Sequence, residues 1–332
     1  MPIGDHPTQR CGLTTRITIT RRALLRAGLG SGLALLAGSS TAATKKPTGT
    51  IARGSEEPMT NKLKVSVVQF RSGTDLSDNT LRHCKLIEQC AREGSRVVVF
   101  PECSLTGFTD DAVTKVGQTE LTKAESTLCA AAKEAGVYAI VGAPTKAEKL
   151  IYNSALVITP KGEIIERYHK VHLAGEKWAT PGDHISVFPI DGVLCSIIIC
   201  HDERYPELVR LPVIAGARVV FYISCESGLN EEHKIAPYRA QVMARAVENG
   251  VYLVHSNAPA DKEGNGGSHG QSRIVKPDGN LIHEAGIREE EVISAELDII
   301  KASGAYARMS TECPFLRDWW TAGVGKVRKV SG

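Results

Sequence analysis

The pattern of apolar and polar positions predicts alternating strands and helices from about residue 62 onward. Short segments that alternate or run apolar predict strands, and longer segments with helical periodicity predict helices. The predicted strands lie at 63–70, 95–102, 137–144, 217–224, 251–257 and 291–297, with hairpins at 153–171, 184–200 and 271–286. The predicted helices lie at 79–94, 120–136, 206–217 and 231–250.

This succession predicts an α/β fold with mixed sheets in a single domain over residues 62–298. Consecutive βα units favour parallel strands, whereas the hairpins, such as the one that turns at Asp191-Gly192, add antiparallel pairs. From Ile299 the pattern becomes irregular and carries the adjacent Trp319 and Trp320. We therefore expect residues 299–332 to form a C-terminal arm that contacts a partner subunit.

The first 43 residues have the pattern of a secretory signal. Arg21 and Arg22 precede an apolar run that ends in small residues, and the surrounding TRRALLRA is typical of twin-arginine signals, which export folded proteins. The run holds roughly a dozen residues, fewer than the about 20 of a spanning helix, which predicts cleavage after Ala42 or Ala43 and no stable membrane insertion. A membrane anchor and a disordered basic arm are the alternatives. Residues 44–61 are predicted to be a flexible lead-in.

Removal of this leader changes the electrostatic picture. The whole chain has 40 Lys and Arg against 37 Asp and Glu, but residues 1–43 hold five Arg and one Asp, so the mature part has a net charge of about −1. Such a balance predicts no basic surface for binding nucleic acid.

Eight cysteines remain once Cys11 is removed, and those at Cys84 and Cys195 lie in apolar patterns. They predict small buried side chains rather than a disulfide framework.

Three reactive side chains are predicted to follow strand ends. Glu102 ends the segment RVVVFPE, Lys170 ends EIIERYHK and Cys200 ends VLCSIIIC. Groups at strand ends converge at one edge of a sheet in open α/β folds. A neighbouring Lys favours the thiolate of a cysteine, and a carboxylate within reach removes the thiol proton. Together the three predict a nucleophile, a general base and an oxyanion-stabilising cation.

The same residues carry a resemblance to a known family. FPECSLTGF, YHKVHL and CHDERYPE, in this order, resemble the Glu, Lys and Cys motifs of the nitrilase superfamily of carbon-nitrogen hydrolases. VVQF, ARAVENGVYLVHSN and GQSRIVKPDGNLI also match the family pattern, so the resemblance extends from Leu63 to the 290s. It implies a four-layer αββα sandwich, catalytic roles for Glu102, Lys170 and Cys200, and a homodimer or higher homo-oligomer. No metal or cofactor is implied.

The resemblance also implies supporting residues. Glu176, shortly before a Pro-Gly, stands where the family often has a further Glu that positions the Lys or the substrate amide; the alternative is a solvated loop carboxylate. The backbone N–H of His201 is the expected second oxyanion donor, and its imidazole is a candidate for the pocket lining. Cys225 ends VVFYIS and is a rival nucleophile by position, but it lacks a matching motif and is better assigned to a pocket wall.

The residues after Cys200 separate the branches of the superfamily. Nitrilases usually continue as Cys-Trp-Glu-Asn, whereas amidases and carbamoyl-amide hydrolases tend towards Cys-x-Asp-x-Arg-x-Pro-Glu, which CHDERYPE fits. We therefore expect hydrolysis of a linear amide or N-carbamoyl compound through a Cys thioester, with release of ammonia or an amine. Nitrile hydrolysis and a noncatalytic exported binding protein are the alternatives. The twin-arginine machinery would deliver the enzyme to the periplasm or the exterior, and an unused leader would leave it in the cytoplasm.

Two histidine pairs have competing interpretations. His169 and His172 suggest a metal pair, but no Cys or carboxylate cluster of ligand spacing lies nearby, which favours packing. His255 with Asn257 offers a papain-like partner for Cys200, against which the ordered Glu and Lys motifs argue.

The charges around the thiol create a tension. Three carboxylates follow Cys200 closely in sequence and would raise its pKa: Asp202, Glu203 and Glu207. We therefore expect Arg204 to form a salt bridge with Asp202, Glu207 or another buried carboxylate.

Cys103, next to Glu102, is expected to point away from it on an extended backbone and to be buried.

Overall fold

The computed structural model describes residues 61–226, 235–261 and 267–332. The predicted leader, 1–43, and all but the last residue of the predicted lead-in lie outside the described residues. The described residues all belong to one compact unit of the chain.

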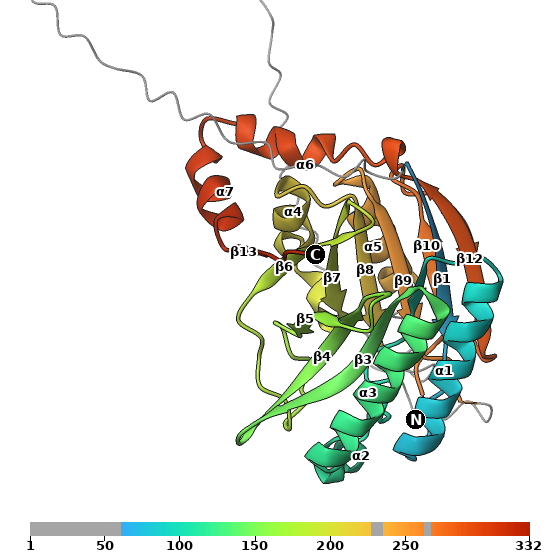
Figure 1. Cartoon of the computed structure of the whole chain (residues 1–332). Coiled ribbons are helices and arrows are strands. Elements are labelled where there is room, and N and C mark those ends of the chain that lie inside the picture. Colours follow the sequence, from blue (N-terminus) through green and yellow to red (C-terminus); the bar gives the residue numbers. More distant parts are fainter. Residues whose placement is uncertain (1–60, 227–234, 262–266) are drawn as a thin grey trace, which may run out of the picture. The chain divides into compact units, whose positions relative to one another are not determined.

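Two mixed β-sheets lie at the centre of the described unit (Figure 1). The first has the strand order β12 (Glu291–Asp298), β1 (Lys62–Gln69), β2 (Val97–Val99), β3 (Tyr138–Ala147), β4 (Leu150–Ile158), β5 (Ile164–His169). The second has the order β11 (Leu281–Glu284), β10 (Arg273–Val275), β9 (Tyr252–Asn257), β8 (Val219–Ser224), β7 (Val193–Ile199), β6 (Ile185–Ile190), β13 (Val327–Lys329). Both sheets mix parallel and antiparallel pairs, so the mixed α/β prediction is confirmed.

Helices cover the outer faces of the two sheets. Ile87 of α1 (Leu76–Arg92) and Leu128 of α3 (Gln118–Ala135) are buried in one apolar cluster with Val141 of the first sheet. Val209 of α4 (Glu207–Ile214) and Val242 of α5 (Ile235–Val247) are buried in another with Val220 of the second sheet.

A third apolar cluster joins the two sheets to each other, with Val99 on one side and Ile197 on the other. The order of layers is therefore helix, sheet, sheet, helix, and the predicted αββα sandwich is confirmed. Because both faces of each sheet are buried, strands such as VVFYIS are buried throughout and show no alternation of apolar and polar residues.

The predicted hairpin turn at Asp191-Gly192 is confirmed. It joins β6 to the antiparallel β7, and both turn residues have positive φ angles, 47° for Asp191 and 78° for Gly192. Asp and Gly tolerate this conformation better than other residues, and the two-residue turn of this kind matches the twist of the flanking strands. The turn fixes the register of β7, and thereby the point at which the strand ends in Cys200.

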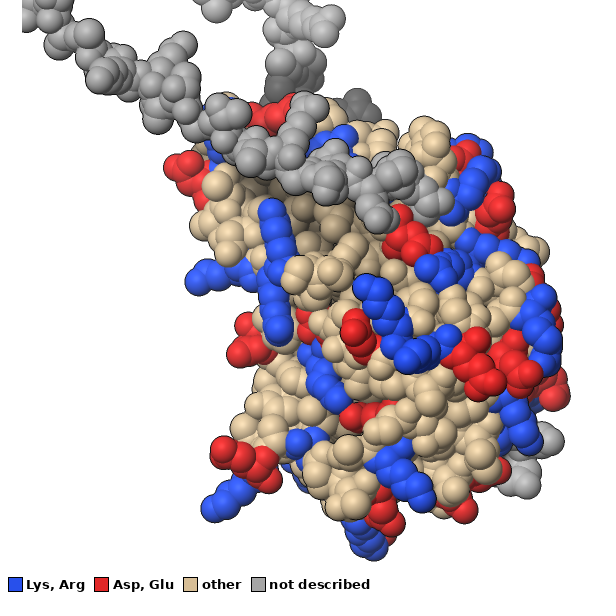
Figure 2. All heavy atoms as spheres, in the orientation of Figure 1, with Lys and Arg blue, Asp and Glu red and all other residues tan. Residues whose placement is uncertain are grey.

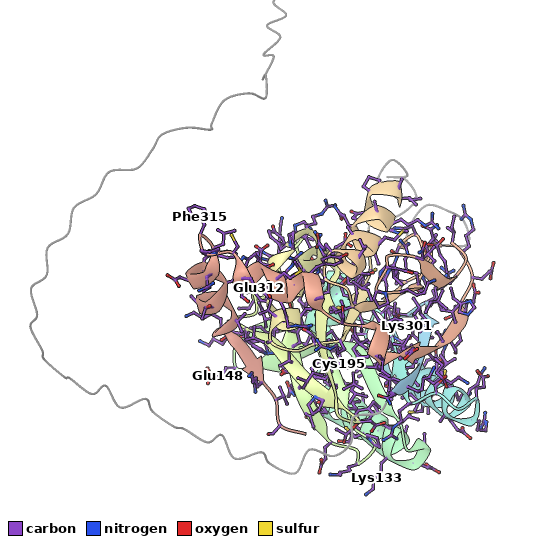
Figure 3. The ribbon with its side chains drawn as sticks, turned by 90° about the horizontal axis from the view of Figure 1, so that it is seen from above. Lys133, Glu148, Cys195, Lys301, Glu312 and Phe315 are labelled. Carbon is purple, nitrogen blue, oxygen red and sulfur yellow. The ribbon has the colours of Figure 1, made fainter. Side chains whose placement is uncertain are left out.

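The C-terminal arm is more regular than the sequence predicted. It contains α6 (Ala305–Met309), α7 (Arg317–Val324) and β13, which pairs parallel with β6 at the edge of the second sheet. These elements are too short to show a periodicity, as is α2 (Asp110–Lys115), which the sequence analysis also missed. Phe315, 92% exposed, projects outward from the arm (Figure 3), and a contact of this arm with a partner subunit stays a prediction.

Surface charge and cysteine state accord with an ordinary globular unit. On the face shown in Figure 2, Lys and Arg side chains are interspersed with Asp and Glu. In the described part of the chain, no helix has the length and apolarity needed to cross a bilayer. The cysteines described there are not joined in disulfides, and Cys195 lies in the buried core between the sheets.

Glycine at position 142 allows the Glu102 segment to cross strand β3 at close range. A Cβ atom at Gly142 would lie 2.2 Å from the backbone O of Pro101 and 2.7 Å from the Cα of Glu102. Real Cβ atoms do not approach backbone atoms so closely, so any larger residue would push the Glu102 segment away.

We therefore expect Gly142→Ala to lower the free energy of unfolding by about 2–3 kcal/mol, because the backbone of residues 101–103 must shift. Gly73→Ala is the matched control, since a Cβ there meets its nearest atoms at 3.8 Å. Urea denaturation of both variants measures the difference. Equal stabilities of the two variants would show that the close approach carries no cost.

Candidate active site

Three strand ends from the two sheets bring the predicted reactive side chains together. Glu102 follows β2, Lys170 directly follows β5 and Cys200 directly follows β7. Strands β2 and β5 point the same way, because β2 is parallel to β3 and two antiparallel pairings connect β3 to β5. Glu102 and Lys170 therefore share an edge of the first sheet, but Cys200 comes from the second. The expectation of a single sheet edge is wrong, and the site lies between the ends of two stacked sheets.

The carboxylate of Glu102 is held by three donors. Its Oε1 accepts hydrogen bonds from Lys170 Nζ at 2.8 Å and from Asn153 Nδ2 at 2.7 Å, and its Oε2 accepts one from the backbone N–H of Cys225 at 2.7 Å. The side chains of Glu102 and Lys170 are both fully buried. Asn153 was missed by the sequence analysis, which saw in NSALV only the start of a strand.

Glu176 is the second carboxylate bound to Lys170. Its Oε1 accepts a hydrogen bond from Lys170 Nζ, and its Oε2 accepts one from the backbone N–H of Ala174 at 2.5 Å. Its side chain is 4% exposed, so Glu176 lies inside the site rather than in solvent. Gly182 allows this loop to close, because its N–H donates to Lys170 O at 2.8 Å and a Cβ would lie 2.2 Å from His169 O.

A strained backbone turn presents the thiol. Cys200 has a φ of 44°, a left-handed conformation that non-glycine residues rarely adopt, at the first residue of the 3₁₀ helix η1 (Cys200–Arg204). The abrupt change from strand to turn places Cys200 in the wall of a cavity instead of continuing the strand into the core. His201, the next residue, belongs to the first turn of η1, whose N–H groups have no acceptor within the helix.

Asp202 links the cysteine turn to the lysine segment. Its Oδ2 accepts hydrogen bonds from the Ile199 N–H at 3.1 Å and the Tyr168 hydroxyl at 2.8 Å, and its Oδ1 accepts one from the His172 N–H at 2.8 Å. These donors, rather than the expected Arg204, satisfy the Asp202 carboxylate. Burial raises the pKa of Asp202 to about 6, against the lowering effect of the same hydrogen bonds.

The guanidinium of Arg204 lies over the ring of Tyr238, with 5.2 Å from its central carbon to the ring centroid. Arg204 is largely exposed at this position. It therefore contributes to the cavity wall as a cation stacked on an aromatic ring.

The electrostatic state of the site favours a neutral thiol beside a charged lysine. Burial, then the carboxylate of Glu102, raises the pKa of Cys200 well above its ordinary value, and Lys170 only partly offsets them. Burial opposes the charge on Lys170, but the carboxylates of Glu102 and Glu176 raise its pKa above the ordinary value. Burial also raises the pKa of Glu102, although Lys170 lowers it. A protonated thiol needs a base at the moment of attack, and Glu102 is the carboxylate placed to provide one.

The carboxylates with the largest effect on the pKa of Cys200 come from other parts of the chain. After burial, Glu102 and then Glu226 are the carboxylates that raise this pKa most. Nearby carboxylates thus raise the pKa of Cys200, as the sequence predicted, but those with the largest effect follow other strands of the fold.

The thiol opens into a cavity of about 440 Å³. Lys170, Glu176, Cys200, His201 and Cys225 all line this cavity, so the structure brings together these five predicted residues. Its size suits a small molecule. The remaining lining residues are Phe108, Asp110, Ala174, Gly175, Trp178, Glu203, Arg204, Tyr222, Glu226, Tyr238 and Gly267.

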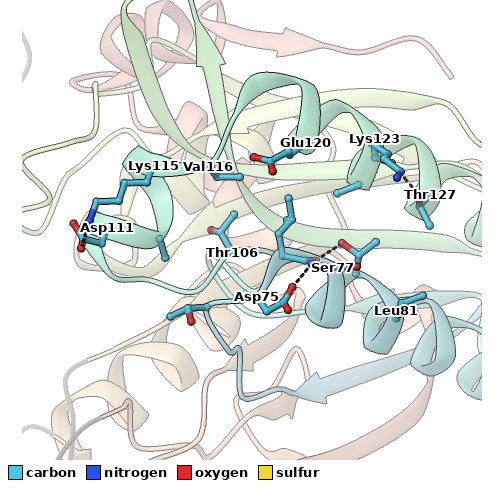
Figure 4. A pocket seen from close by; sticks show the side chains of 15 residues that line it. Asp75, Ser77, Leu81, Thr106, Asp111, Lys115, Val116, Glu120, Lys123 and Thr127 are labelled. Atoms are coloured by element: carbon cyan, nitrogen blue, oxygen red, sulfur yellow. Dashed lines mark hydrogen bonds and ion pairs between the residues drawn. The ribbon is translucent and has the colours of Figure 1, made fainter.

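A larger cavity, of about 630 Å³, lies elsewhere (Figure 4). It is lined by residues around the N-terminal ends of α1 and α3, including Asp75, Ser77, Lys115 and Glu120. None of its lining residues is a cysteine or a histidine, so it offers neither a thiol nucleophile nor an imidazole base.

The alternative histidine assignments find no support. His169 stacks on Tyr152 and hydrogen-bonds Ser154 Oγ through Nδ1 at 2.8 Å, whereas His172 stacks on Tyr205. Within residues 61–226, 235–261 and 267–332, no group of three or more His, Cys, Asp or Glu side chains is arranged to hold a metal ion.

The papain-like pair is also engaged elsewhere. His255 Nε2 hydrogen-bonds Ser224 Oγ at 2.7 Å, and burial lowers the pKa of His255 to about 3, so it is neutral.

Cys103 is buried as predicted, but its φ of 49° shows that the backbone is not extended there. Its Sγ donates to Asn153 Oδ1 at 3.6 Å.

Comparisons with known proteins show the family and the fold. Residues 64–305 match the family model described as Carbon-nitrogen hydrolase. The chain is 30% identical to omega-amidase NIT2-A of Xenopus laevis over 250 residues, 72% of this chain and 89% of the relative. It is 32% identical over 224 residues to a nitrilase of Pyrococcus abyssi, 65% of this chain and 81% of the relative. The crystal structure of an amidase from Nesterenkonia sp. superposes with a TM-score of 0.68 at 24% identity, covering 77% of this chain and 96% of that one.

Replacement of Lys170 by Met leaves two buried carboxylates without their cation, and we expect the free energy of unfolding at pH 7 to fall by about 3–5 kcal/mol. Without the ammonium, the pKa values of Glu102 and Glu176 in the folded state rise above those of the unfolded chain. The folded variant then binds more protons, so it regains stability as the pH falls from about 7 to about 5.

Urea denaturation at several pH values measures this effect. Lys115→Met, at a lysine whose side chain is 73% exposed, is the control and should change stability by no more than about 0.5 kcal/mol at any pH. A loss for Lys170→Met that grows on acidification would contradict the assignment of Lys170 as the counter-ion of two carboxylates.

Proposed function

Since the chain belongs to the carbon-nitrogen hydrolase family, we propose that it hydrolyses a linear amide or N-carbamoyl compound through a thioester on Cys200. The observation that carries this proposal is the position of Lys170. Its buried side chain binds Glu102 and Glu176, and it lines the same cavity as Cys200. A thiol, a base and a cation in this arrangement fit acyl transfer through a covalent intermediate.

The first half of the reaction forms the thioester. Glu102 accepts the thiol proton while Sγ of Cys200 attacks the carbonyl carbon, and the Lys170 ammonium and the His201 N–H stabilise the oxyanion. Glu102 then donates the proton to the leaving nitrogen, which departs as ammonia or an amine. The Cys225 N–H and Asn153 hold Glu102 in place during both transfers.

The second half hydrolyses the thioester. Water attacks the acyl carbon, Glu102 takes its proton, and the proton returns to Sγ as the carboxylic or carbamic acid leaves. Glu176 keeps Lys170 oriented towards the oxyanion through both halves. The steps use side chains and backbone N–H groups of this chain, and the net reaction consumes one water.

Two observations favour amides over nitriles. The sequence after the nucleophile, CHDERYPE, has the amidase pattern, and the omega-amidase is among the relatives of this chain. The Pyrococcus abyssi relative named a nitrilase is the reason to retain nitrile hydrolysis as the second candidate. A noncatalytic binding protein would not need a buried charged triad, whose desolvation is unfavourable.

Cys200→Ala is expected to lower the rate of ammonia release from the best substrate at least about a thousandfold, because the nucleophile is removed. The panel contains linear amides, ureido acids and nitriles. Cys313→Ser, at the exposed cysteine of the C-terminal arm, is the control and should keep the wild-type rate. Equal rates for wild type and Cys200→Ala would refute the assignment, and turnover of nitriles alone would favour the second candidate.

We also propose that residues 1–43 direct export through the twin-arginine machinery, with arrival in the periplasm or outside the cell. In a host with this route, we expect the protein to be exported and shortened near Ala42. Arg21→Lys with Arg22→Lys should leave it full length in the cytoplasm, because the arginine pair is the recognised element.

Cell fractionation and N-terminal mass spectrometry measure both quantities. Arg10→Lys with Arg16→Lys makes the same chemical change outside the motif and should leave export intact. Wild-type protein that stays full length and cytoplasmic would contradict the leader assignment.

A further inference from the structure

The cavity beside Cys200 contains a buried carboxylate that the proposed reaction does not use. Glu203 is the third residue after the nucleophile, lines the cavity and is 1% exposed. Among the residues that the structure describes, neither of its carboxylate oxygens has a hydrogen-bond partner. A buried carboxylate without a donor is unfavourable, and its retention calls for a partner that arrives from the cavity.

Arg204, Arg245 and Arg273 contribute to the electrostatic surroundings of Glu203, but none of them donates a hydrogen bond to its carboxylate. Arg245 Nε donates to the backbone O of Glu203 at 2.8 Å, and its Nη1 pairs with Glu248 at 3.0 Å. Arg273 Nε donates to Gln271 O at 2.7 Å and lies 3.4 Å from a carboxylate oxygen of Glu284. Arg204 lies over the Tyr238 ring in the cavity wall, and Arg273 Nη1 and Nη2 have no hydrogen-bond partner in the described part of the chain. The Glu203 carboxylate thus has no hydrogen-bonded partner of its own among the described residues.

A second carboxylate stands in the same cavity wall. Glu226, 4% exposed, accepts a hydrogen bond from the Tyr222 hydroxyl at 2.5 Å, and its other oxygen lies 2.9 Å from His269 Nε2. Asp110 is a further carboxylate of the lining. On the basic side, Lys170 is matched by Glu102 and Glu176, so Arg204 is the lining cation that stands against Glu203, Glu226 and Asp110.

Aromatic rings complete the lining. Phe108, Trp178, Tyr222 and Tyr238 all border the cavity. The faces of aromatic rings attract organic cations, and they do so more strongly in a space from which water is excluded. Carboxylates and aromatic rings around one small cavity are the chemistry that recognises an ammonium or guanidinium group.

We propose that the substrate carries a cationic group, an ammonium or guanidinium, that binds to Glu203 in this cavity. This inference rests on the proposed function, because it assigns the part of the same substrate that lies beyond the reacting amide. Glu203 is then the residue that selects for charge, with Glu226 and the aromatic rings as its support.

Binding of a cation is coupled to a proton. Burial, then Glu226, raises the pKa of Glu203 well above its ordinary value, against the lowering effect of Arg204, Arg245 and Arg273. An arriving cation stabilises the ionised carboxylate and lowers that pKa, so binding releases a proton and strengthens as the pH rises towards the pKa of the empty site.

Three five-carbon amides test the inference: δ-aminovaleramide with a terminal ammonium, neutral valeramide, and glutaramate with a terminal carboxylate. We expect the wild type to show a kcat/KM about tenfold or more higher for δ-aminovaleramide than for valeramide, and lowest for glutaramate. Glu203→Gln should lower kcat/KM about tenfold for δ-aminovaleramide and change it less than about twofold for valeramide. Glu134→Gln, at an exposed position of α3, is the control and should change none of the three values.

A binding measurement separates this inference from the reaction itself. Calorimetric titration with pentylammonium, which has no amide, should show binding to the wild type with proton release, and about tenfold weaker binding to Glu203→Gln. Binding without turnover of any amide would refute the proposed reaction and retain the cation site. Turnover that is equal for the three amides, faster for glutaramate, or equally reduced for all three in Glu203→Gln would overturn the cation site, as would absence of pentylammonium binding to the wild type.

Discussion

The interaction on which the site depends is the burial of one lysine ammonium between two carboxylates. Lys170 binds Glu102 at 2.8 Å and also binds Glu176, with all three side chains almost fully buried. None of these charges would be tolerable alone in the interior, because each needs the others to replace lost hydration. The pairing therefore holds together the end of β5, the segment after β2 and the loop that carries Glu176. The thiol of Cys200 reaches the same place from the end of a strand of the second sheet.

Local backbone features allow the segments that carry these side chains to approach one another closely enough to form the site. Gly142 lets the Glu102 segment cross β3, and Gly182 lets the Glu176 loop close on Lys170. Cys200 accepts a left-handed φ of 44° so that its strand ends abruptly at the cavity, and Asp202 holds that turn to the lysine segment. The two sheets provide rigid strands, and these few residues position the side chains at the strand ends so that they form a site.

Local signals in the sequence predicted the alternation of strands and helices, and the resemblance to the carbon-nitrogen hydrolases implied the αββα layers. Glu102, Lys170 and Cys200 each follow a strand and meet in the structure, whereas their catalytic roles stay predictions. The sequence could not show that the cysteine comes from a different sheet, since strand order depends on pairing between distant segments. Asn153 and the N–H of Cys225, which hold Glu102, were missed for the same reason. The short helices of the C-terminal arm and the partners of Asp202 and Arg204 likewise depend on tertiary contacts rather than on pattern.

The central claim is that Cys200 carries the acyl group. Rapid acid quenching of the wild type during the first turnovers of its best amide, followed by peptide mass spectrometry, tests it most directly. The account predicts that the peptide containing Cys200 gains the mass of the substrate less that of ammonia or the departing amine. Ammonia release with the acyl group on Cys103 or Cys225, or on no cysteine at all, would contradict it.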